Sequence, residues 1–374
     1  MKGVFITGAN GNIGSRLVKE YLTASDYKLF LLVRGASQQR AVDRLKEAMA
    51  FWGVPFERYE DRIEVLCGDV TLPGLGLAPE RAEALRNQVH LFVHAASSIS
   101  LDLPLADARR MILGGTQNAY RLSREFPHLE RFGFVSTMEI VGRYAGLVKE
   151  EFLTNYPLDF LNTYEIAKFE AEEFLRTQIE TGASVSIFRP SMVVGESITG
   201  KALGFQSFYM MVEKMLLAPD YSVLPDGPSV DTIPVDVLVQ GMVGLMAAPA
   251  SKNQIYHFAQ GRADLMTFSE FIAKLQPLLE SRLGRKIKRP KYVNPVVHRG
   301  LLTLLSKLTW GELGRLVRVQ LVFVKFAGLT WQIDNPKTRS ALAALPVSWP
   351  SFDQYLPALI DYYLAHRDEN RMPF

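Results

Sequence analysis

Tyr164 and Lys168 are the residues of this sequence whose types and spacing most directly suggest chemistry. Two residues four positions apart lie on one face of a helix. A free tyrosine has a pKa of about 10, and a nearby ammonium group lowers that pKa by stabilising the phenolate. We therefore interpret Tyr164 as a proton donor with Lys168 as its partner, although the same spacing also occurs by chance in many helices.

Two hydroxyl residues, Ser136 and Thr137, end an apolar run that precedes this pair in the sequence. One of the two hydroxyls is expected to hydrogen-bond a substrate carbonyl oxygen beside Tyr164. The alternative is that both are hydroxyls at a strand end whose hydrogen bonds go to the backbone.

Three glycines follow the first apolar run of the chain at a spacing of three residues. In a dinucleotide-binding turn the glycines permit a tight turn, let the pyrophosphate approach the backbone, and let the helix pack closely on the strand. The next helix then offers free N–H groups to the phosphates. We expect such a turn here rather than an ordinary glycine-rich connection. The residues expected to bind the dinucleotide at this turn are Gly8, Asn10, Gly11, Asn12, Ile13 and Gly14.

Arg34 ends the second apolar run, where NAD-binding proteins usually carry an acidic residue for the ribose 2′-hydroxyl. A carboxylate would repel a 2′-phosphate, whereas a guanidinium can bind it through two hydrogen bonds. Arg44 is a second candidate for this contact. The two arginines predict NADPH as the cofactor; the alternative is that Arg34 only faces solvent.

Apolar strand-like runs alternate with helix-like segments in the first half of the chain. The expected strands are 3–7, 28–33, 62–66, 89–93, 131–136 and 184–189, and the expected helices are 12–23, 37–51, 105–126 and 160–179. This alternation predicts an α/β fold with a doubly wound parallel Rossmann sheet. Beyond Pro190 the alternation stops. We expect a Rossmann domain of 1–195, to which 231–260 returns, and a smaller, mostly helical substrate lobe of 196–230 and 261–374.

The composition excludes several classes of protein. Of the 374 residues, 48% are hydrophobic and 22% are charged, which is typical of a folded chain rather than a disordered one. The 42 Lys and Arg against 39 Asp and Glu give a net charge of +3, too small to imply a nucleic-acid surface. A single cysteine, Cys67, excludes an internal disulfide and a multi-cysteine metal site, and we expect no metal.

The sequence also bears on location. No apolar run reaches the roughly 18 residues that span a bilayer, and the first predicted strand starts at residue 3, which leaves no room for a signal peptide. We therefore expect a soluble cytoplasmic enzyme.

Together, the glycine spacing and the Tyr-x-x-x-Lys pair resemble the extended short-chain dehydrogenase/reductase superfamily. Three further segments narrow the resemblance: Leu75-Gly76-Leu77, His94-Ala95-Ala96-Ser97, and Arg189-Pro190-Ser191-Met192-Val193-Val194-Gly195 followed by Thr199-Gly200. They are similar to the fatty acyl-CoA reductases and to the thioester reductase domains of carboxylic acid reductases and peptide synthetases. The resemblance to this male-sterility-type NAD-binding family covers about residues 1–260 and is weak beyond them.

The resemblance implies roles for further residues. Thr137 is implied as the catalytic hydroxyl, because members place it five residues before a glycine, here Gly142, and it would act with Tyr164 and Lys168. Members often carry an Asn that relays protons at the position that Ile112 occupies here. This chain lacks the Asn that such a proton relay would use. Asp69 would face the adenine amino group, unless it only forms a turn. The cofactor contacts implied in this way are Asp69, Val70, Ala95, Ala96, Ser97, Tyr164, Lys168, Pro190 and Val193.

The implied reaction is the NADPH-dependent reduction of an acyl thioester, linked to CoA or to a carrier protein, to an aldehyde. A second hydride would give the alcohol, and the sequence leaves this step open. The alternative enzymes are a hydroxysteroid-dehydrogenase-like protein or a nucleotide-sugar-modifying epimerase, which usually carry an acidic residue where Arg34 stands. A cofactor-sensing regulator would usually lack the Tyr164–Lys168 pair.

Two features of the later sequence concern the substrate. One apolar stripe is expected either to shape an acyl pocket or simply to form core: Phe205, Phe208, Tyr209, Met210, Met211, Met215, Leu216 and Leu217. A helical face of Leu301, Leu304, Leu305 and Leu308 would reinforce the pocket. The run from Arg282 to Lys291 holds six Lys and Arg. A solvated strand face is favoured for it over CoA phosphates, a carrier protein or a membrane surface, and membrane contact would be peripheral at most.

Overall fold

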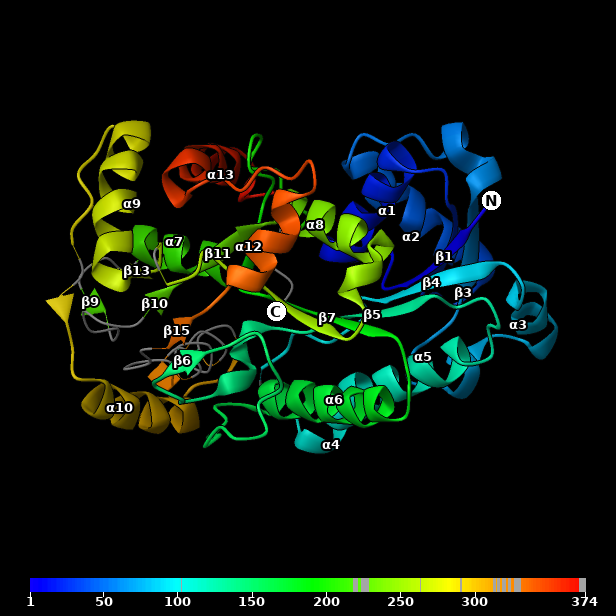
Figure 1. Ribbon diagram of the computed structural model, residues 1–374. Helices are drawn as coiled ribbons and strands as arrows, with labels where there is room; N and C mark the ends of the chain where they lie inside the picture. The colour runs from blue at the N-terminus through cyan, green and yellow to red at the C-terminus, as the bar shows by residue number, and fades with distance from the viewer. Residues whose placement is uncertain are drawn as a thin grey trace.

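A seven-stranded parallel sheet forms the centre of the protein in the computed structural model (Figure 1). The structure describes residues 1–374 apart from 102, 218–220, 223–228, 263, 290, 312–313, 315–316, 318–320, 322–323, 326–330 and 370–374. The strands follow the order β12 (Gln254–Phe258), β7 (Val185–Pro190), β5 (Arg131–Val135), β4 (Val89–His94), β1 (Gly3–Thr7), β2 (Lys28–Val33) and β3 (Ile63–Cys67). The predicted doubly wound α/β fold is confirmed.

Each central strand is apolar on both faces because helices cover both faces of the sheet. All five residues of β1 are buried; Val4 and Ile6 pack into one core and Phe5 into the other. The first core is covered by α1 (Asn12–Ala24), α2 (Gln38–Phe51) and α8 (Val235–Ala247). On the opposite face lie α4 (Leu105–Arg109), α5 (Gly115–Ser123) and α6 (Thr163–Glu180), as Figure 1 shows, while α3 (Pro79–Leu85) flanks β3 at the edge.

Two predicted helices differ from the observed ones. The helix expected over 105–126 is α4, a π-helical turn (Arg110–Gly114) and α5 in succession. The break falls at the pair Gly114-Gly115, residues of low helix propensity, and Gly115 lets Val70 approach closely. The helix expected from 160 begins instead at Thr163, because the Asn162 side chain accepts a hydrogen bond from the backbone N–H of Glu165 and caps it.

The segment 231–260 adds α8 and β12 to the central sheet and its cover, whereas the residues around it form a second, mostly helical part. In that part α7 (Phe208–Leu217), α9 (Phe268–Leu283) and α13 (Phe352–His366) share an apolar core, and α10 (Pro295–Leu308) and α12 (Pro336–Ala343) lie outside it. A two-stranded sheet of β6 (Leu147–Val148) and β15 (Gln332–Ile333) joins the two parts. Three further two-stranded sheets pair β8 (Met192–Val194) with β11 (Thr232–Pro234), β9 (Tyr221–Ser222) with β14 (Lys291–Tyr292), and β10 (Ser229–Val230) with β13 (Met266–Thr267). The exact domain boundaries stay a prediction.

The apolar stripe that begins at Phe205 is mostly core. Phe205, Phe208, Tyr209, Met215 and Leu216 are buried against α9 and α13, whereas Met210 and Met211 are half-buried and the side chain of Leu217 lies outside the described residues. Leu301, Leu304 and Leu308 are exposed, so the expectation that they line a pocket is wrong for these three. Of the basic run, only Lys291 lies in a strand, β14.

Among the described residues, no helix combines the length and the apolar character that crossing a membrane requires.

The turn between β1 and α1 is closed so tightly that only glycine fits at two of its positions. Gly8 has a φ of 69°, in the left-handed region that favours glycine. A Cβ atom on Gly14 would lie 2.0 Å from the carbonyl oxygen of Gly8. The helix therefore starts directly against the end of the strand, as the sequence predicts.

We expect Gly14→Ala to lower the free energy of unfolding by more than about 2 kcal/mol, because the backbone must move to admit the methyl group. Gly300→Ala is the matched control: Gly300 lies within α10 and a Cβ there meets no atom within 4 Å. This change should stabilise the protein by about 0.5–1 kcal/mol. Urea unfolding of the three proteins measures both effects, and equal stability of Gly14→Ala and wild type would contradict the packing described.

Candidate active site

The carboxyl ends of β1 and β4 meet beside the glycine turn. The Thr7 hydroxyl hydrogen-bonds the His94 Nδ1 at 2.7 Å and accepts a bond from the backbone N–H of Ala96 at 3.2 Å. A Cβ atom on Gly8 would lie 2.8 Å from the Cα of Ala96. The structure thus brings the predicted residues Gly8, Ala95 and Ala96 together. Burial lowers the pKa of His94 to about 3, so this histidine is a packed neutral residue and not a base at neutral pH.

The first turn of α1 fits the phosphates of a dinucleotide. Its N-cap is Gly11, which provides no side-chain cap, and the first turn holds no acidic residue. The Asn12 Oδ1 is buried and has no hydrogen-bond partner among the described residues. An anionic ligand would therefore meet free backbone N–H groups and the positive end of the helix dipole, in a space that side chains cannot fill. Asn10 and Ile13 lie in the same turn, half-buried.

Arg34 is exposed at the end of β2, and the Arg44 guanidinium reaches it from α2. Arg44 donates a hydrogen bond to the backbone carbonyl oxygen of Arg34 at 2.5 Å. The two predicted phosphate-binding cations are thus adjacent. Asp69, at the end of β3, accepts a hydrogen bond from the backbone N–H of Thr71 at 2.8 Å, which makes it a turn-forming residue as well.

The other predicted cofactor contacts also lie at the carboxyl ends of the strands. Val70 follows Asp69, and its carbonyl oxygen accepts a hydrogen bond from the Asn118 side chain at 2.9 Å. Ser97 is exposed beyond β4. Pro190 ends β7 beside Phe258, and Val193 lies in β8. Gly8, Arg34, Asp69, Ala95 and Pro190 thus mark the carboxyl ends of β1, β2, β3, β4 and β7, and Arg44 and Lys168 approach these ends from α2 and α6.

Thr137 and Tyr164 lie close together, with both residues more than nine-tenths buried, and the Thr137 hydroxyl acts to lower the pKa of the phenol. Thr137 follows β5 and its hydroxyl also accepts a bond from the backbone N–H of Glu139. Burial raises the pKa of Tyr164 above its ordinary value, and the nearby Glu139 raises that pKa further. The phenol is consequently protonated at neutral pH, in the state required of a hydrogen-bond and proton donor.

Lys168 lies one helical turn after Tyr164 and is 2% exposed. Its ammonium donates a hydrogen bond to the carbonyl oxygen of Val135 at 2.7 Å and lies 4.8 Å from the centre of the Phe134 ring. Burial lowers the pKa of Lys168 to about 7. The expected lowering of the Tyr164 pKa by Lys168 is not found: burial, Glu139 and Glu165 raise this pKa, and the group that lowers it is Thr137. Burial affects both groups by disfavouring their charged forms.

A buried ion pair behind these residues was missed from the sequence. Arg189 of β7 and Glu172 of α6 are 0% and 2% exposed and form two bonds, at 2.6 Å and 3.0 Å. The same carboxylate accepts a hydrogen bond from Ser136 at 2.5 Å. Arg189 also bonds His257 of β12 at 3.2 Å. Ser136, the alternative to Thr137, is therefore committed to Glu172, which leaves Thr137 as the hydroxyl beside Tyr164.

One further residue near the site, Glu139, was not predicted from the sequence. The Glu139 carboxyl is half-buried beside Thr137 and Tyr164, and burial raises its pKa to about 7. Ile112 is buried in the π-helical turn and cannot relay protons. In the sequence, Glu139 could have been singled out by its position two residues after Thr137. Among the described residues, no group of three His, Cys, Asp or Glu is arranged to hold a metal.

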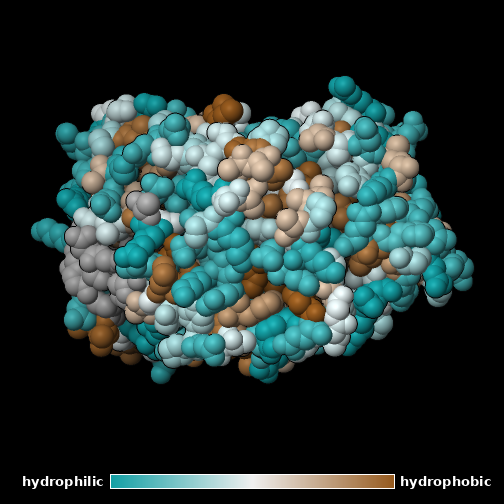
Figure 2. Space-filling view, viewed as in Figure 1, coloured by the Kyte–Doolittle hydropathy of each residue, from teal (hydrophilic) through white to brown (hydrophobic). Residues whose placement is uncertain are grey.

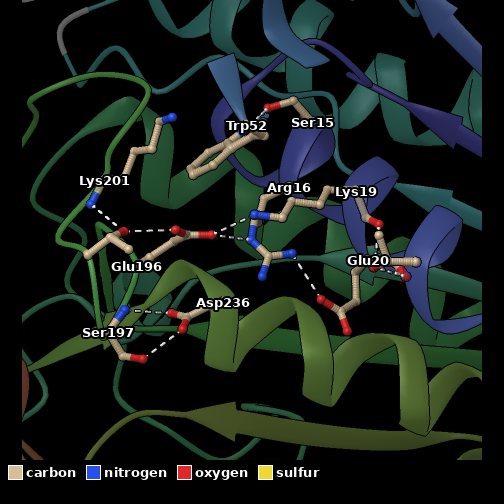
Figure 3. A network of polar contacts seen from close by, with 11 residues as sticks. Ser15, Arg16, Lys19, Glu20, Trp52, Glu196, Ser197, Lys201 and Asp236 are labelled. Atoms are coloured by element: carbon tan, nitrogen blue, oxygen red, sulfur yellow. Dashed lines mark hydrogen bonds and ion pairs between the residues drawn. The ribbon is translucent and has the colours of Figure 1, made fainter. Parts of the chain in front are cut away.

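A second polar network links α1 to the segment that follows β8 (Figure 3). Arg16 bonds Glu196 at 3.0 Å and Glu20 at 2.9 Å, and Lys19 bonds Glu196 at 3.3 Å. Ser197 donates two hydrogen bonds to the Asp236 carboxylate of α8, at 2.9 Å and 2.7 Å. The segment that leads into the second part of the molecule is thus attached to α1, the helix that follows the phosphate turn (the glycine turn of residues 8–14).

The comparisons with known proteins point to one family. The NAD-binding family model described as Male sterility protein matches residues 6–242. The L-2-aminoadipate reductase large subunit of Candida glabrata is 25% identical over 293 residues, which cover 73% of this chain and 21% of that protein. Fatty acyl-CoA reductase wat of Drosophila melanogaster is 27% identical over 232 residues, which cover 53% of this chain and 45% of that protein. The chain thus spans less than half the length of either relative.

Among solved structures, the terminal R domain from the myxalamid PKS-NRPS biosynthetic pathway superposes with a TM-score of 0.81 at 22% identity, covering 100% of this chain and 93% of that one. A thiolation-reductase di-domain from an archaeal non-ribosomal peptide synthetase gives a TM-score of 0.76 at 18% identity, covering 99% of this chain and 76% of that one. At these identities the likeness establishes the fold.

We expect Lys168→Met to raise the free energy of unfolding, most strongly at low pH. The pKa of Lys168 is about 7 in the folded protein and 10.5 when unperturbed, so the folded state binds this proton less tightly than the unfolded chain. The buried ammonium therefore destabilises the fold fully below pH 7, and this destabilisation fades as the pH rises towards 10.5. Urea unfolding across this range should show a gain of at least about 1 kcal/mol at the acid end.

Lys252→Met is the control, because Lys252 is exposed and its substitution should give no pH-dependent gain. A gain from Lys168→Met that grows with rising pH would refute the assigned burial.

Proposed function

Because the chain belongs to the NAD-binding family described as Male sterility protein, we propose that it uses NADPH to reduce an acyl thioester to an aldehyde and a free thiol. The observation that carries the proposal is the buried Thr137–Tyr164 hydroxyl pair at the same sheet edge as the phosphate turn. A donor pair beside a nicotinamide site is the arrangement that carbonyl reduction requires.

The residues present fit a dinucleotide. The backbone N–H groups at the start of α1 would bind the pyrophosphate, and the close approach of Gly8 to Ala96 leaves no room for a side chain at position 8. Arg34 and Arg44 would bind a 2′-phosphate, and neither is committed to a carboxylate by any contact that the described residues make. These two cations favour NADPH over NADH.

The bound nicotinamide would supply the hydride to the thioester carbonyl carbon. Thr137 and Tyr164 would donate hydrogen bonds to the carbonyl oxygen, and these bonds strengthen as negative charge develops on it. Tyr164 then gives its proton to that oxygen, which yields a hemithioacetal. Collapse of the hemithioacetal breaks the C–S bond and releases the aldehyde and the thiol.

The environment of Tyr164 suits this step. A phenol held in its protonated form by burial donates a hydrogen bond without first having to capture a proton. Lys168 fixes the end of β5 through the Val135 carbonyl and places a positive charge behind the phenol when protonated. Reprotonation through an Asn at position 112 is not available, since Ile112 occupies it.

The names of the relatives support a thioester substrate. They include aminoadipate and fatty acyl-CoA reductases, and the solved structures include a thiolation-reductase di-domain. We propose a CoA- or carrier-linked acyl group for this chain, with an apolar acyl portion against the second part of the molecule. Further reduction of the aldehyde would use the same Thr137–Tyr164 pair.

We expect Tyr164→Phe to reduce turnover by about 10²–10⁴-fold, the usual contribution of general acid catalysis, while NADPH binding survives. The assay follows NADPH consumption and free-thiol release from acyl-CoAs of increasing chain length, with sterols and nucleotide sugars as comparison substrates. Thiol should appear in proportion to oxidised cofactor.

Tyr21→Phe is the matched control, since the Tyr21 hydroxyl is buried without a hydrogen-bond partner among the described residues and its loss should leave turnover unchanged. Near-normal turnover of Tyr164→Phe would remove the residue from the proposed role. Turnover of a sterol or nucleotide sugar without any thiol release from thioesters would overturn the proposed substrate class.

We expect Arg34→Ala to weaken NADPH binding by on the order of 1.5–3 kcal/mol, the value of a charge-assisted hydrogen bond, and to leave NADH binding nearly unchanged. Titration of both cofactors into wild type, Arg34→Ala and the control Arg86→Ala measures this difference; Arg86 lies exposed at the end of α3. Equal affinity of the wild type for the two cofactors would disprove the predicted preference.

A further inference from the structure

The exposed apolar side chains of this protein are concentrated in one short stretch. Among the described residues, ten large apolar side chains are exposed, and six of these lie between 296 and 310. Their exposed fractions run from 54% to 82%, and they are Val296, Val297, Leu301, Leu304, Leu308 and Trp310. Single exposed apolar residues are normal on a protein surface, whereas a contiguous group marks a contact surface.

The helix α10 presents apolar residues on two sides. Its inner side holds Leu302 and Leu305, which pack against Val317 and Val324 in a small cluster. Its outer side holds Val297, Leu301, Leu304 and Leu308, spaced by four, three and four residues, which is the spacing of one continuous helical stripe. The inner side explains how the helix attaches to the protein. Among the described residues, no apolar cluster includes the outer stripe.

The charge on α10 itself is of one sign, because the helix carries Arg299 and Lys307 and no Asp or Glu. From 281 to 311 the sequence contains eight Lys and Arg and no Asp or Glu. Arg282 pairs with Asp361 and Lys286 with Glu280, so two carboxylates from outside the segment balance part of this charge. Arg299 and Lys307 lie on α10 itself and are exposed. The residues from 282 to 289 run back along α9, whereas α10 itself combines an apolar stripe with two exposed cations.

We propose that the outer face of α10 is the site through which this protein rests on an anionic lipid bilayer. The aliphatic stripe would enter the boundary between headgroups and acyl chains, with the helix lying in the plane of the surface. Arg299 and Lys307 on the helix would contact the negatively charged headgroups. At 1.5 Å per residue the 14-residue helix is about 21 Å long, so the stripe spans several lipids.

The position of the helix favours a surface of this kind. In Figure 1, α10 lies at the lower left edge of the molecule, and Figure 2 shows brown apolar side chains at the same edge. A helix at an edge can meet a flat surface along its whole length. Trp310, which is 82% exposed just beyond the helix, is of the residue type that prefers the boundary between lipid and water.

The charge also argues against the other occupants of such a face. A second copy of the chain placed symmetrically on α10 would bring two cationic segments together, and like charges repel. An acidic protein would match the charge, but four exposed aliphatic residues along one helical stripe, followed by a tryptophan, match the boundary between lipid and water and favour a bilayer. The bilayer proposal concerns binding only and stands apart from the proposed reaction.

Vesicle flotation with the full chain tests the proposal. The probes are vesicles of phosphatidylcholine alone and of phosphatidylcholine mixed with phosphatidylglycerol, each at low and high salt. We expect binding to the anionic vesicles, weaker binding at high salt and little binding to the neutral ones. On binding, the emission of Trp310 should shift to shorter wavelength, and the shift should vanish in Trp310→Phe.

The decisive variant replaces the stripe: Leu301→Gln, Leu304→Gln and Leu308→Gln together, at positions exposed enough to leave the fold intact. We expect vesicle affinity to fall by more than about tenfold, because three leucines no longer leave water. The matched control is Leu72→Gln with Ile198→Gln, two exposed apolar residues elsewhere, which should bind as wild type does. NADPH binding should be the same in all variants.

Three results would overturn the proposal. One is equal binding of wild type and the stripe variant to anionic vesicles. Another is equal binding of wild type to neutral and anionic vesicles. The third is absence of vesicle binding together with a change of oligomeric state in the stripe variant, measured by light scattering, which would assign the face to a second copy. None of these results bears on thioester reduction, so failure here is distinguishable from failure of the proposed reaction.

Discussion

The buried pair of Glu172 and Arg189 is the interaction on which the arrangement of the candidate site depends. It joins α6, which carries Tyr164 and Lys168, to β7, and through Ser136 it reaches the residue next to Thr137. Removing either partner would leave an unpaired charge in the interior, which typically costs about 3–5 kcal/mol. Because both oxygens of Glu172 are engaged, α6 can neither slide along the sheet nor rotate without losing several bonds at once.

The second polar network extends this constraint to the phosphate turn. Arg16 and Lys19 lie on α1, and Glu196 and Ser197 lie on the segment that leads into the second part of the molecule. The helix that would bind the pyrophosphate and the segment that leads into the second part of the molecule are therefore fixed to each other and not only to the sheet. Glu196 keeps its charge there, since the pKa of this carboxyl is lowered by Thr199, Lys19 and Arg16 although burial opposes them.

The sheet and the phosphate turn could be predicted from the sequence because their signals are local. Runs such as Val4-Phe5-Ile6 are apolar at every position because both faces of a parallel sheet are buried, and the glycine spacing reports a turn that admits no Cβ. The Glu172–Arg189 pair joins two elements whose register only the folded chain determines. The raised pKa of Tyr164 depends on how deeply the phenol is buried, which composition does not report. For α10, the sequence showed an apolar face but not which side the protein leaves exposed.

The edge strand β12 limits where the chain can be divided when parts of related proteins are exchanged. It pairs with β7 from Gln254 to Phe258, after the chain has left the sheet and returned through α8. A cut after β8 would separate six strands from the seventh and strip one face of its α8 cover, including the buried Met242 and Leu245. An exchange of parts between related proteins, in evolution or in the laboratory, must therefore transfer residues 1–260 together. This unit includes the residues between β8 and β11, which lie outside the central sheet.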